Sequence, residues 1–223
     1  MIAEETNNNI AALPVLTASE GTSLSYIFSS MKSASVPFKK ACRQHNLHMP
    51  LNENKLTQIY VEQVEVQIKI NSFLGVKNQY SDTFGGTKGV PDFYFHKIEE
   101  GVHHLPLFIV ESKVLPVPIK KREKEYVIGE KNNGGIERYK TEKHGKGLDN
   151  CGILGFVEDK TFDDWLSVIN MWIVELSQSN NGWNQDEVLT MTENREDYAC
   201  LESTAHRTSQ SDVQLFHLWI TLI

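Results

Sequence analysis

Two short segments of the chain combine apolar runs with charged residues that could bind a cation. The first, residues 89–95, reads Gly-Val-Pro-Asp-Phe-Tyr-Phe, and the second, residues 107–113, reads Leu-Phe-Ile-Val-Glu-Ser-Lys. If both are strands, Glu111 and Lys113 share one face, because side chains alternate along a strand. If the strands also pair, Asp92 joins them. Buried carboxylates are costly when unpaired, so this convergence predicts either a metal ion or an opposite charge beside them.

The composition of both segments supports strands. Each is rich in β-branched and aromatic residues, as buried strands are. The intervening residues 96–106 are polar and contain Gly101, which is typical of a loop between antiparallel strands. The sequence therefore predicts paired strands over 90–95 and 107–114. The alternative for the three charged residues is an ion pair on the surface, at the strand ends.

The pattern Pro91-Asp92 followed by Glu111-Ser112-Lys113 resembles the PD-(D/E)XK nuclease superfamily, which includes restriction endonucleases, junction resolvases and repair nucleases. The resemblance implies an α/β fold with a mixed central β-sheet flanked by helices. It also implies Mg²⁺-dependent hydrolysis of phosphodiester bonds, with Mn²⁺ able to substitute for Mg²⁺. By the motif, Asp92 and Glu111 bind the metal with the Ser112 carbonyl, while Lys113 positions or activates the attacking water.

Members of this superfamily often carry a further metal-directed Glu on the helix that precedes the sheet. Apolar residues at three- and four-residue steps predict such a helix over 52–73, with Asn52 as its cap. Glu53 and Glu62 are the candidates, and Glu53 is preferred because residues 53–57 resemble a Glu-x-x-Leu-Thr opening. A plain acid in the first turn is the alternative. Alternating apolar residues in the second half of this segment also fit a strand.

A basic stretch follows the second strand. From Lys113 to Lys146, ten Lys and Arg residues face five Asp and Glu residues, although the whole chain has a net charge of -7. Such a stretch could follow a phosphate backbone, and a solvated loop is the alternative. The candidates for binding nucleic acid are Lys120, Lys121, Arg122, Arg138 and Lys140. The superfamily often adds a polar residue from the next helix, predicted here over 136–145, where Glu137 or Arg138 would serve.

The remaining sequence fits one domain over residues 25–223, preceded by a flexible segment over 1–24. Apolar patterns predict a short helix within 25–48 and a loop-rich connection over 75–89. Further along they predict a central strand over 151–157 and a helix over 162–176 whose tryptophans pack in the core. A final strand pair is expected over 199–206 and 213–222, where His206, Arg207 and His217 have no chemical role.

Composition restricts the setting of the protein. Three widely spaced cysteines without a CxxC motif indicate free thiols in a reducing cytoplasm. The N-terminal residues do not resemble a signal peptide, and no apolar run reaches the length of a membrane span, so we expect a cytoplasmic protein without a membrane partner.

The leading functional hypothesis is a metal-dependent nuclease that acts on DNA, in a restriction or antiphage defence system. One alternative is a noncatalytic module that binds nucleic acid or protein on a nuclease-like scaffold. Another is a nuclease subunit that is active only with a partner, because the sequence contains no obvious module for reading bases. A homodimer or a partner subunit would then supply recognition.

Overall fold

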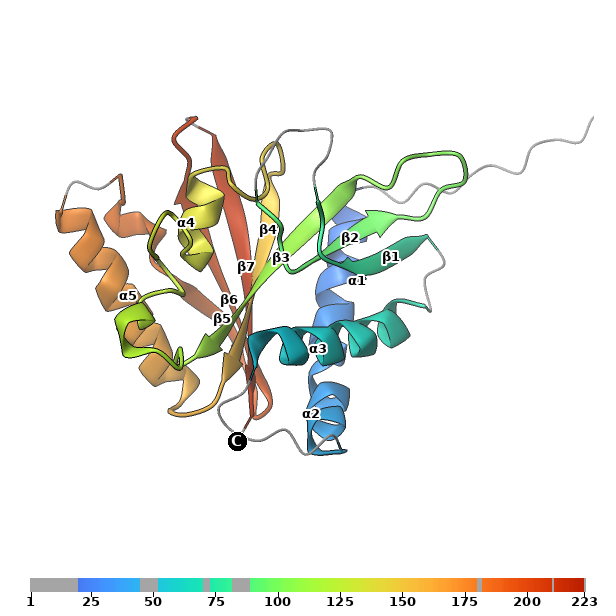
Figure 1. The fold of residues 1–223 in the computed structure, drawn as a ribbon, viewed down its shortest axis with the longest axis horizontal. Helices are drawn as coiled ribbons and strands as arrows, with labels where there is room; N and C mark the ends of the chain where they lie inside the picture. The colour runs from blue at the N-terminus through green and yellow to red at the C-terminus, as the bar shows by residue number, and fades with distance from the viewer. Residues whose placement is uncertain are drawn as a thin grey trace, which may run out of the picture.

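The computed structural model describes residues 20–44, 52–69, 73–81, 89–179, 182–209 and 211–222, and within them it forms one mixed sheet with helices on both faces (Figure 1). The strands are β1 (Leu74–Asn78), β2 (Phe93–Lys97), β3 (Pro106–Leu115), β4 (Asn150–Val157), β5 (Thr190–Asn194), β6 (Tyr198–His206) and β7 (Asp212–Thr221). The helices are α1 (Glu20–Ser33), α2 (Ser35–Gln44), α3 (Glu53–Ile68), α4 (Gly135–Lys140) and α5 (Phe162–Gln178), with short 3₁₀ turns η1 (Lys120–Arg122) and η2 (Gln185–Glu187).

The strand order is β1-β2-β3-β4-β7-β6-β5. The first three strands form an antiparallel meander, and β3, β4 and β7 then run parallel. The outer strands β6 and β5 are again antiparallel to their neighbours. Parallel neighbours need crossover connections, and the segments that carry α4 and α5 provide them. The expected mixed α/β sheet is therefore confirmed.

Two apolar cores lie on opposite faces of the sheet. Helices α1, α2 and α3 cover one face, where Tyr60 and Phe38 pack against Phe93, Phe156 and their neighbours. Segments α4 and α5 lie on the other face (Figure 1), which contains Trp165, Trp172 and Trp219. Strand β3 contributes to both cores through alternate residues, as its period of two requires. The predicted core role of the α5 tryptophans is confirmed.

Several predicted elements are confirmed with small changes in their bounds. Helix α3 begins after Asn52, whose side-chain oxygen accepts hydrogen bonds from the N–H groups of Asn54 and Lys55, at 2.9 and 3.4 Å. It remains helical to Ile68, so the strand alternative for its second half is wrong. Residues 70–72, at the end of the predicted helix, lie outside the described residues. The strands expected in 90–95, 107–114, 151–157, 199–206 and 213–222 are present.

Four predictions of local structure need correction. The connection over 75–89 contains strand β1, which pairs along its whole length with β2. Helix α4 ends at Lys140, not at 145. The region 25–48 holds two helices, and the first begins at Glu20, so the expected flexible segment 1–24 ends too late: Ser23 is already buried in α1. Residues 1–19 lie outside the described part of the chain.

A buried hydrogen-bond chain holds the segment before α4 against the sheet. The Trp219 indole N–H donates to the Tyr126 hydroxyl at 2.8 Å, and that hydroxyl is hydrogen-bonded to Nδ1 of His217 at 2.7 Å. The other ring nitrogen of His217, Nε2, is hydrogen-bonded to the Ser203 hydroxyl at 2.9 Å. Burial lowers the pKa of His217 to about 3, which keeps the ring neutral. His217 therefore has a structural role in the core.

We expect Tyr126→Phe to lower the free energy of unfolding by about 2 kcal/mol or more, because it leaves the buried nitrogens of Trp219 and His217 without partners. Urea denaturation of the variant and the wild type measures this loss. Tyr26→Phe is the matched control, since Tyr26 is 41% exposed and should change stability little. Equal stability of the Tyr126→Phe variant and the wild type would show that the hydroxyl is not needed.

Candidate active site

The site begins where strand β3 extends past its neighbour. Strand β2 begins at Phe93, opposite Val110, so within the described residues no strand lies beside β3 from Glu111 onward on that side. The amides that point to this side are satisfied by carboxylates. The N–H of Ser112 donates to Asp92 Oδ2 at 2.7 Å, and the N–H of Val114 donates to Glu53 Oε2 at 3.1 Å. Unpaired buried amides are costly, so these bonds fix both acids at the edge of β3.

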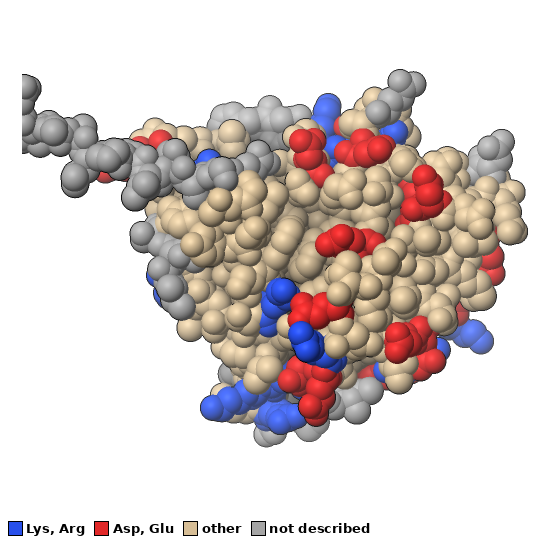
Figure 2. All heavy atoms as spheres, turned by 180° about the vertical axis from the view of Figure 1, so that it is seen from behind, with Lys and Arg blue, Asp and Glu red and all other residues tan. Residues whose placement is uncertain are grey.

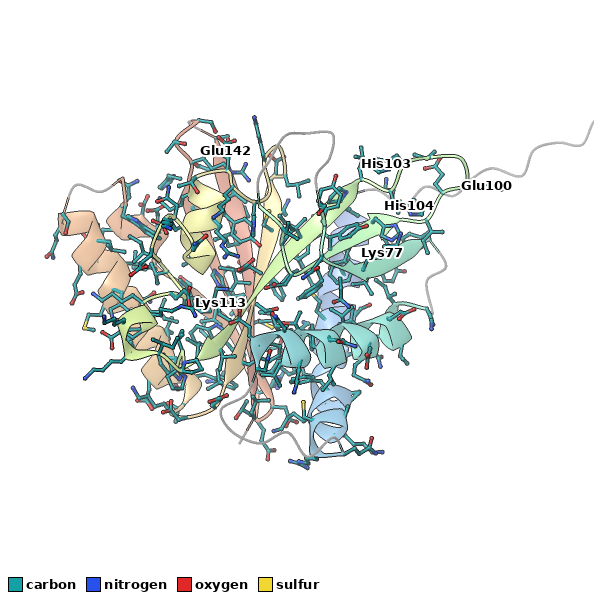
Figure 3. All side chains as sticks on the ribbon, in the orientation of Figure 1. Lys77, Glu100, His103, His104, Lys113 and Glu142 are labelled. Atoms are coloured by element: carbon teal, nitrogen blue, oxygen red, sulfur yellow. The ribbon has the colours of Figure 1, made fainter. Side chains whose placement is uncertain are left out.

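Lys113 lies at the centre of this group. Its Nζ donates to Glu111 Oε1 and to the Ser112 carbonyl, both at 2.7 Å, and lies 3.5 Å from Glu53 Oε1. The side chains of Lys113 and Glu111 are only 5% and 1% exposed. Figure 3 shows Lys113 in the interior of the molecule, far from the His103 and His104 side chains at the tip of the β2–β3 hairpin. The structure thus brings Asp92, Glu111, Lys113 and Glu53 together, and an ion pair on the surface is wrong for Glu111 and Lys113, which are buried.

Two further side chains reach Glu111 from the α4 region. Nη1 of Arg138 forms an ion pair with Oε1, the same oxygen that Lys113 contacts. Nδ1 of His144 lies 3.3 Å from the other oxygen, Oε2. The two atoms nevertheless lack hydrogen-bond geometry, and among the described residues Oε2 and this Nδ1 have no hydrogen-bond partner. One oxygen of Glu111 is therefore crowded with donors, whereas the other is buried and unsatisfied.

The electrostatics of the group follow from burial and charge. Burial alone would raise the pKa of Glu111, but Lys113, His144 and Arg138 outweigh it and lower that pKa to about 2. Asp92 shows the opposite result: burial, followed by repulsion from Glu111, raises its pKa to about 7 despite the opposing charge of Lys113. Burial also raises the pKa of Glu53. Burial would lower the pKa of Lys113, yet the three carboxylates raise it.

The residues present fit a divalent cation in charge and in donor type. Three carboxylates face two basic side chains, and oxygen donors are what Mg²⁺ and Mn²⁺ prefer. The unsatisfied Oε2 of Glu111 is a further buried oxygen donor. Within the part of the chain that the structure describes, no three His, Cys, Asp or Glu side chains are grouped closely enough to hold a metal ion. A cation would be held by Asp92, Glu111 and the Ser112 carbonyl, with Glu53 as a fourth candidate.

Other predicted site residues lie elsewhere. Glu62 is exposed on α3 and accepts a hydrogen bond from Gln58. Glu137 caps α4 by accepting from the N–H groups of Gly129 and Gly134, at 3.0 and 3.2 Å. Both acids thus accept hydrogen bonds from their own segments, and the auxiliary role considered for them stays a prediction. Lys140 is also not available to a phosphate backbone, because it is buried in an ion pair with Glu187.

The remaining basic candidates lie on the surface. Lys120, Lys121 and Arg122 line an open pocket of about 570 Å³ together with Lys124. A hydrogen bond to Glu125 raises the pKa of Arg122, and Glu123, Glu125 and Glu130 line the same pocket. On the face drawn in Figure 2, basic and acidic side chains among the described residues instead lie interspersed, without a continuous basic surface.

Sequence reasoning missed His144 and assigned Arg138 only as a phosphate contact or an auxiliary residue. The one sequence feature related to His144 is Gly89, two residues before Pro91, because the His144 ring packs against this glycine. A Cβ at Gly89 would lie 2.1 Å from Cδ2 of His144, so only glycine lets this segment pass over the ring. A glycine at this point is visible in the sequence, but the partner that requires it is not.

No protein-family model, curated protein or solved structure matches this chain. None of the described helices is long and apolar enough to cross a membrane. The three cysteines, Cys42, Cys151 and Cys200, are free, as expected.

We expect the pH dependence of stability to reveal the strained charge of Asp92. Its pKa rises from the ordinary 3.8 to about 7, so between those values the folded state binds more protons than the unfolded state. Its contribution to stability therefore falls as pH rises through this window. We expect the free energy of unfolding of Asp92→Asn, relative to that of the wild type, to rise by about 2 kcal/mol from about pH 5 to about pH 8.5 in the absence of divalent cations. Urea denaturation at the two pH values measures this change.

The matched control is Asp163→Asn, at an exposed position in the first turn of α5. Its free energy of unfolding should differ from that of the wild type by the same amount at both pH values. The same constant difference for Asp92→Asn would mean that Asp92 is not electrostatically strained. Glu111 acts in the opposite direction, since its lowered pKa gives stability that is lost as pH falls from about 4.5 towards about 2.

Proposed function

We propose that this protein is a metal-dependent nuclease of the PD-(D/E)XK type that hydrolyses phosphodiester bonds. The observation that carries the proposal is the position of the Lys113 ammonium. It contacts Glu111, the Ser112 carbonyl and Glu53, which are three of the four predicted metal ligands. The fourth, Asp92, accepts a hydrogen bond from the N–H of Ser112. A positive charge thus already lies within the ligand set. The antiparallel β2–β3 hairpin followed by parallel β4 fits the expected mixed sheet.

The chain supplies the parts that this chemistry needs. A divalent cation, when bound, neutralises phosphate charge and lowers the pKa of a coordinated water. Asp92 and Glu111 would hold that cation, and their hydrogen bonds to β3 and to basic side chains fix their orientation. Lys113 is charged and positioned to stabilise negative charge that develops on a reacting phosphate or water. Its burial keeps bulk water from screening that charge.

A group of exposed basic side chains after β3 supports nucleic acid as the substrate. Lys120, Lys121 and Arg122, here called the basic rim, line an open pocket that they share with Glu123, Glu125 and Glu130. Phosphate contacts of this kind are independent of sequence and position the backbone. We propose DNA as the polymer and a restriction or antiphage role in the cytoplasm, with Mg²⁺ as the ion and Mn²⁺ as its substitute. Base recognition would come from a second copy or a partner subunit.

We expect Lys113→Met to slow cleavage of linear duplex DNA by roughly 10²–10⁴-fold, because it removes charge stabilisation and any positioned proton transfer. Methionine keeps the apolar stem, and Mn²⁺ should still bind through the carboxylates. Cleavage rates in gels and Mn²⁺ calorimetry measure the two effects. Asp92→Ala should instead weaken Mn²⁺ binding, whereas Lys69→Met, at an exposed end of α3, should change neither.

A wild-type protein that neither cuts DNA or RNA nor binds Mn²⁺ would overturn the proposal and favour the noncatalytic scaffold. Normal cleavage by a folded Lys113→Met variant would remove Lys113 from the mechanism. Because Lys113 neutralises buried carboxylates, circular dichroism must confirm that the variant is folded at the assay temperature.

The basic rim gives a separate prediction. Replacing Lys120 and Lys121 together by Ala should weaken duplex binding about equally for all sequences, and should reduce the slope of log K against log salt by about 2, since each lost phosphate contact removes about 0.9. Fluorescence anisotropy at several salt concentrations measures both. The matched control is the double change of Lys40 and Lys69, which are exposed elsewhere and should keep the wild-type slope. An unchanged slope for the Lys120/Lys121 variant would place the DNA on another surface.

A further inference from the structure

We propose that Arg138 is a displaceable counter-ion that occupies Oε1 of Glu111 and must leave before that oxygen can bind a divalent cation. This inference rests on the proposed function and adds a means of regulating the same site. Its starting point is that the two basic side chains at Glu111, Lys113 and Arg138, contact one carboxylate oxygen. The other oxygen faces His144 and lacks a hydrogen bond among the described residues.

The contacts leave little room for a ligand on Oε1 of Glu111. A carboxylate oxygen has about two lone-pair directions, and donors from Lys113 and Arg138 take both on Oε1. Glu111 is 1% exposed, so rotation of its carboxylate into solvent is not an alternative. A divalent cation beside Oε1 would also be repelled by a guanidinium at contact distance. One of the two basic groups must therefore move for Oε1 to coordinate a cation.

Arg138 is the group that can move. Lys113 is 5% exposed and is held by Glu111, the Ser112 carbonyl and Glu53. The Arg138 side chain is 21% exposed, and in the described residues Glu111 is its one ion-pair partner, while its buried Nε has no hydrogen bond. It extends from α4, a helix of six residues, at the border of the site.

Charge balance favours the exchange. When all three carboxylates are ionised, they face the ammonium of Lys113 and the guanidinium of Arg138, which leaves one negative charge in excess. Replacing the guanidinium by a divalent cation neutralises the group. The released Arg138 could then bind a phosphate of the substrate with its two-pronged fork. Substrate binding and cation binding would thereby support each other, because each stabilises the same position of Arg138.

The test is calorimetric titration of Mn²⁺ into the full chain without nucleic acid. Arg138→Ala should bind Mn²⁺ about tenfold more tightly than the wild type, because the competing cation is gone. Arg138→Gln provides a second neutral variant if the first does not fold, as judged by thermal unfolding. Arg138→Lys keeps a positive charge and should stay within a few-fold of the wild type.

Arg122→Ala is the matched control for the general loss of a positive charge. Arg122 interacts electrostatically with Glu53 but is paired with Glu125, not with Glu111, so its removal should change the Mn²⁺ affinity much less. Equal or weaker Mn²⁺ binding by both neutral Arg138 variants would overturn the inference and leave the nuclease proposal intact. An equal increase in Mn²⁺ affinity from Arg122→Ala would also overturn the inference, because any loss of positive charge would then have the same effect. If neither the wild type nor any variant binds Mn²⁺, the inference and the metal site fail together.

Discussion

The unequal lengths of two neighbouring strands are the constraint on which this site depends. Strand β3 has ten residues and β2 has five, so the second half of β3 needs other partners for its amides on that side. Carboxylates of Asp92 and Glu53 provide them. An amide can be satisfied by any acceptor, but the choice of charged acceptors brings acids into a partly buried position. The positive charge of Lys113 is then needed to offset these acids. Any chemistry at the site would therefore use a charge that also stabilises the fold.

The balance of buried charges distinguishes the site from a second buried ion pair that only resembles it. Lys140 and Glu187 form a second buried ion pair, and Lys140 also lies 4.7 Å from the centre of the Trp183 ring. Both carboxylate oxygens of Glu187 are satisfied in that pair, because they also accept hydrogen bonds from the N–H groups of Asn184 and His206. Around Lys113 the balance is incomplete: acids outnumber bases, and a buried oxygen of Glu111 lacks a hydrogen bond among the described residues. An unbalanced buried group is the arrangement that an added cation would stabilise.

Sequence periodicity predicted the residues that share one strand or one helix turn. The two-residue period placed Glu111 and Lys113 together, and the cap at Asn52 placed Glu53 at the start of α3. Composition could not decide which lysines are solvated, so Lys140 resembled a phosphate contact although it is buried. Contacts between distant segments, such as that of His144 with Glu111, have no local signal. Strand β1 was missed because the glycines later in 75–89 suggested a loop throughout. Gly75 itself lies within the strand, where a Cβ would lie 2.7 Å from Nε2 of His96.

The distribution of these residues along the chain has a consequence for folding kinetics. The bond from Val114 to Glu53 spans 61 positions, and the ion pair of Glu111 with Arg138 spans 27. Contacts between distant positions require closure of long loops, which slows their formation. Helix α3 reaches β3 only as part of a layer with α1 and α2, where the Tyr60 hydroxyl donates to the Met31 carbonyl at 2.8 Å. The charged cluster therefore assembles only when the first helices and the central sheet have docked, and a partly folded chain lacks it.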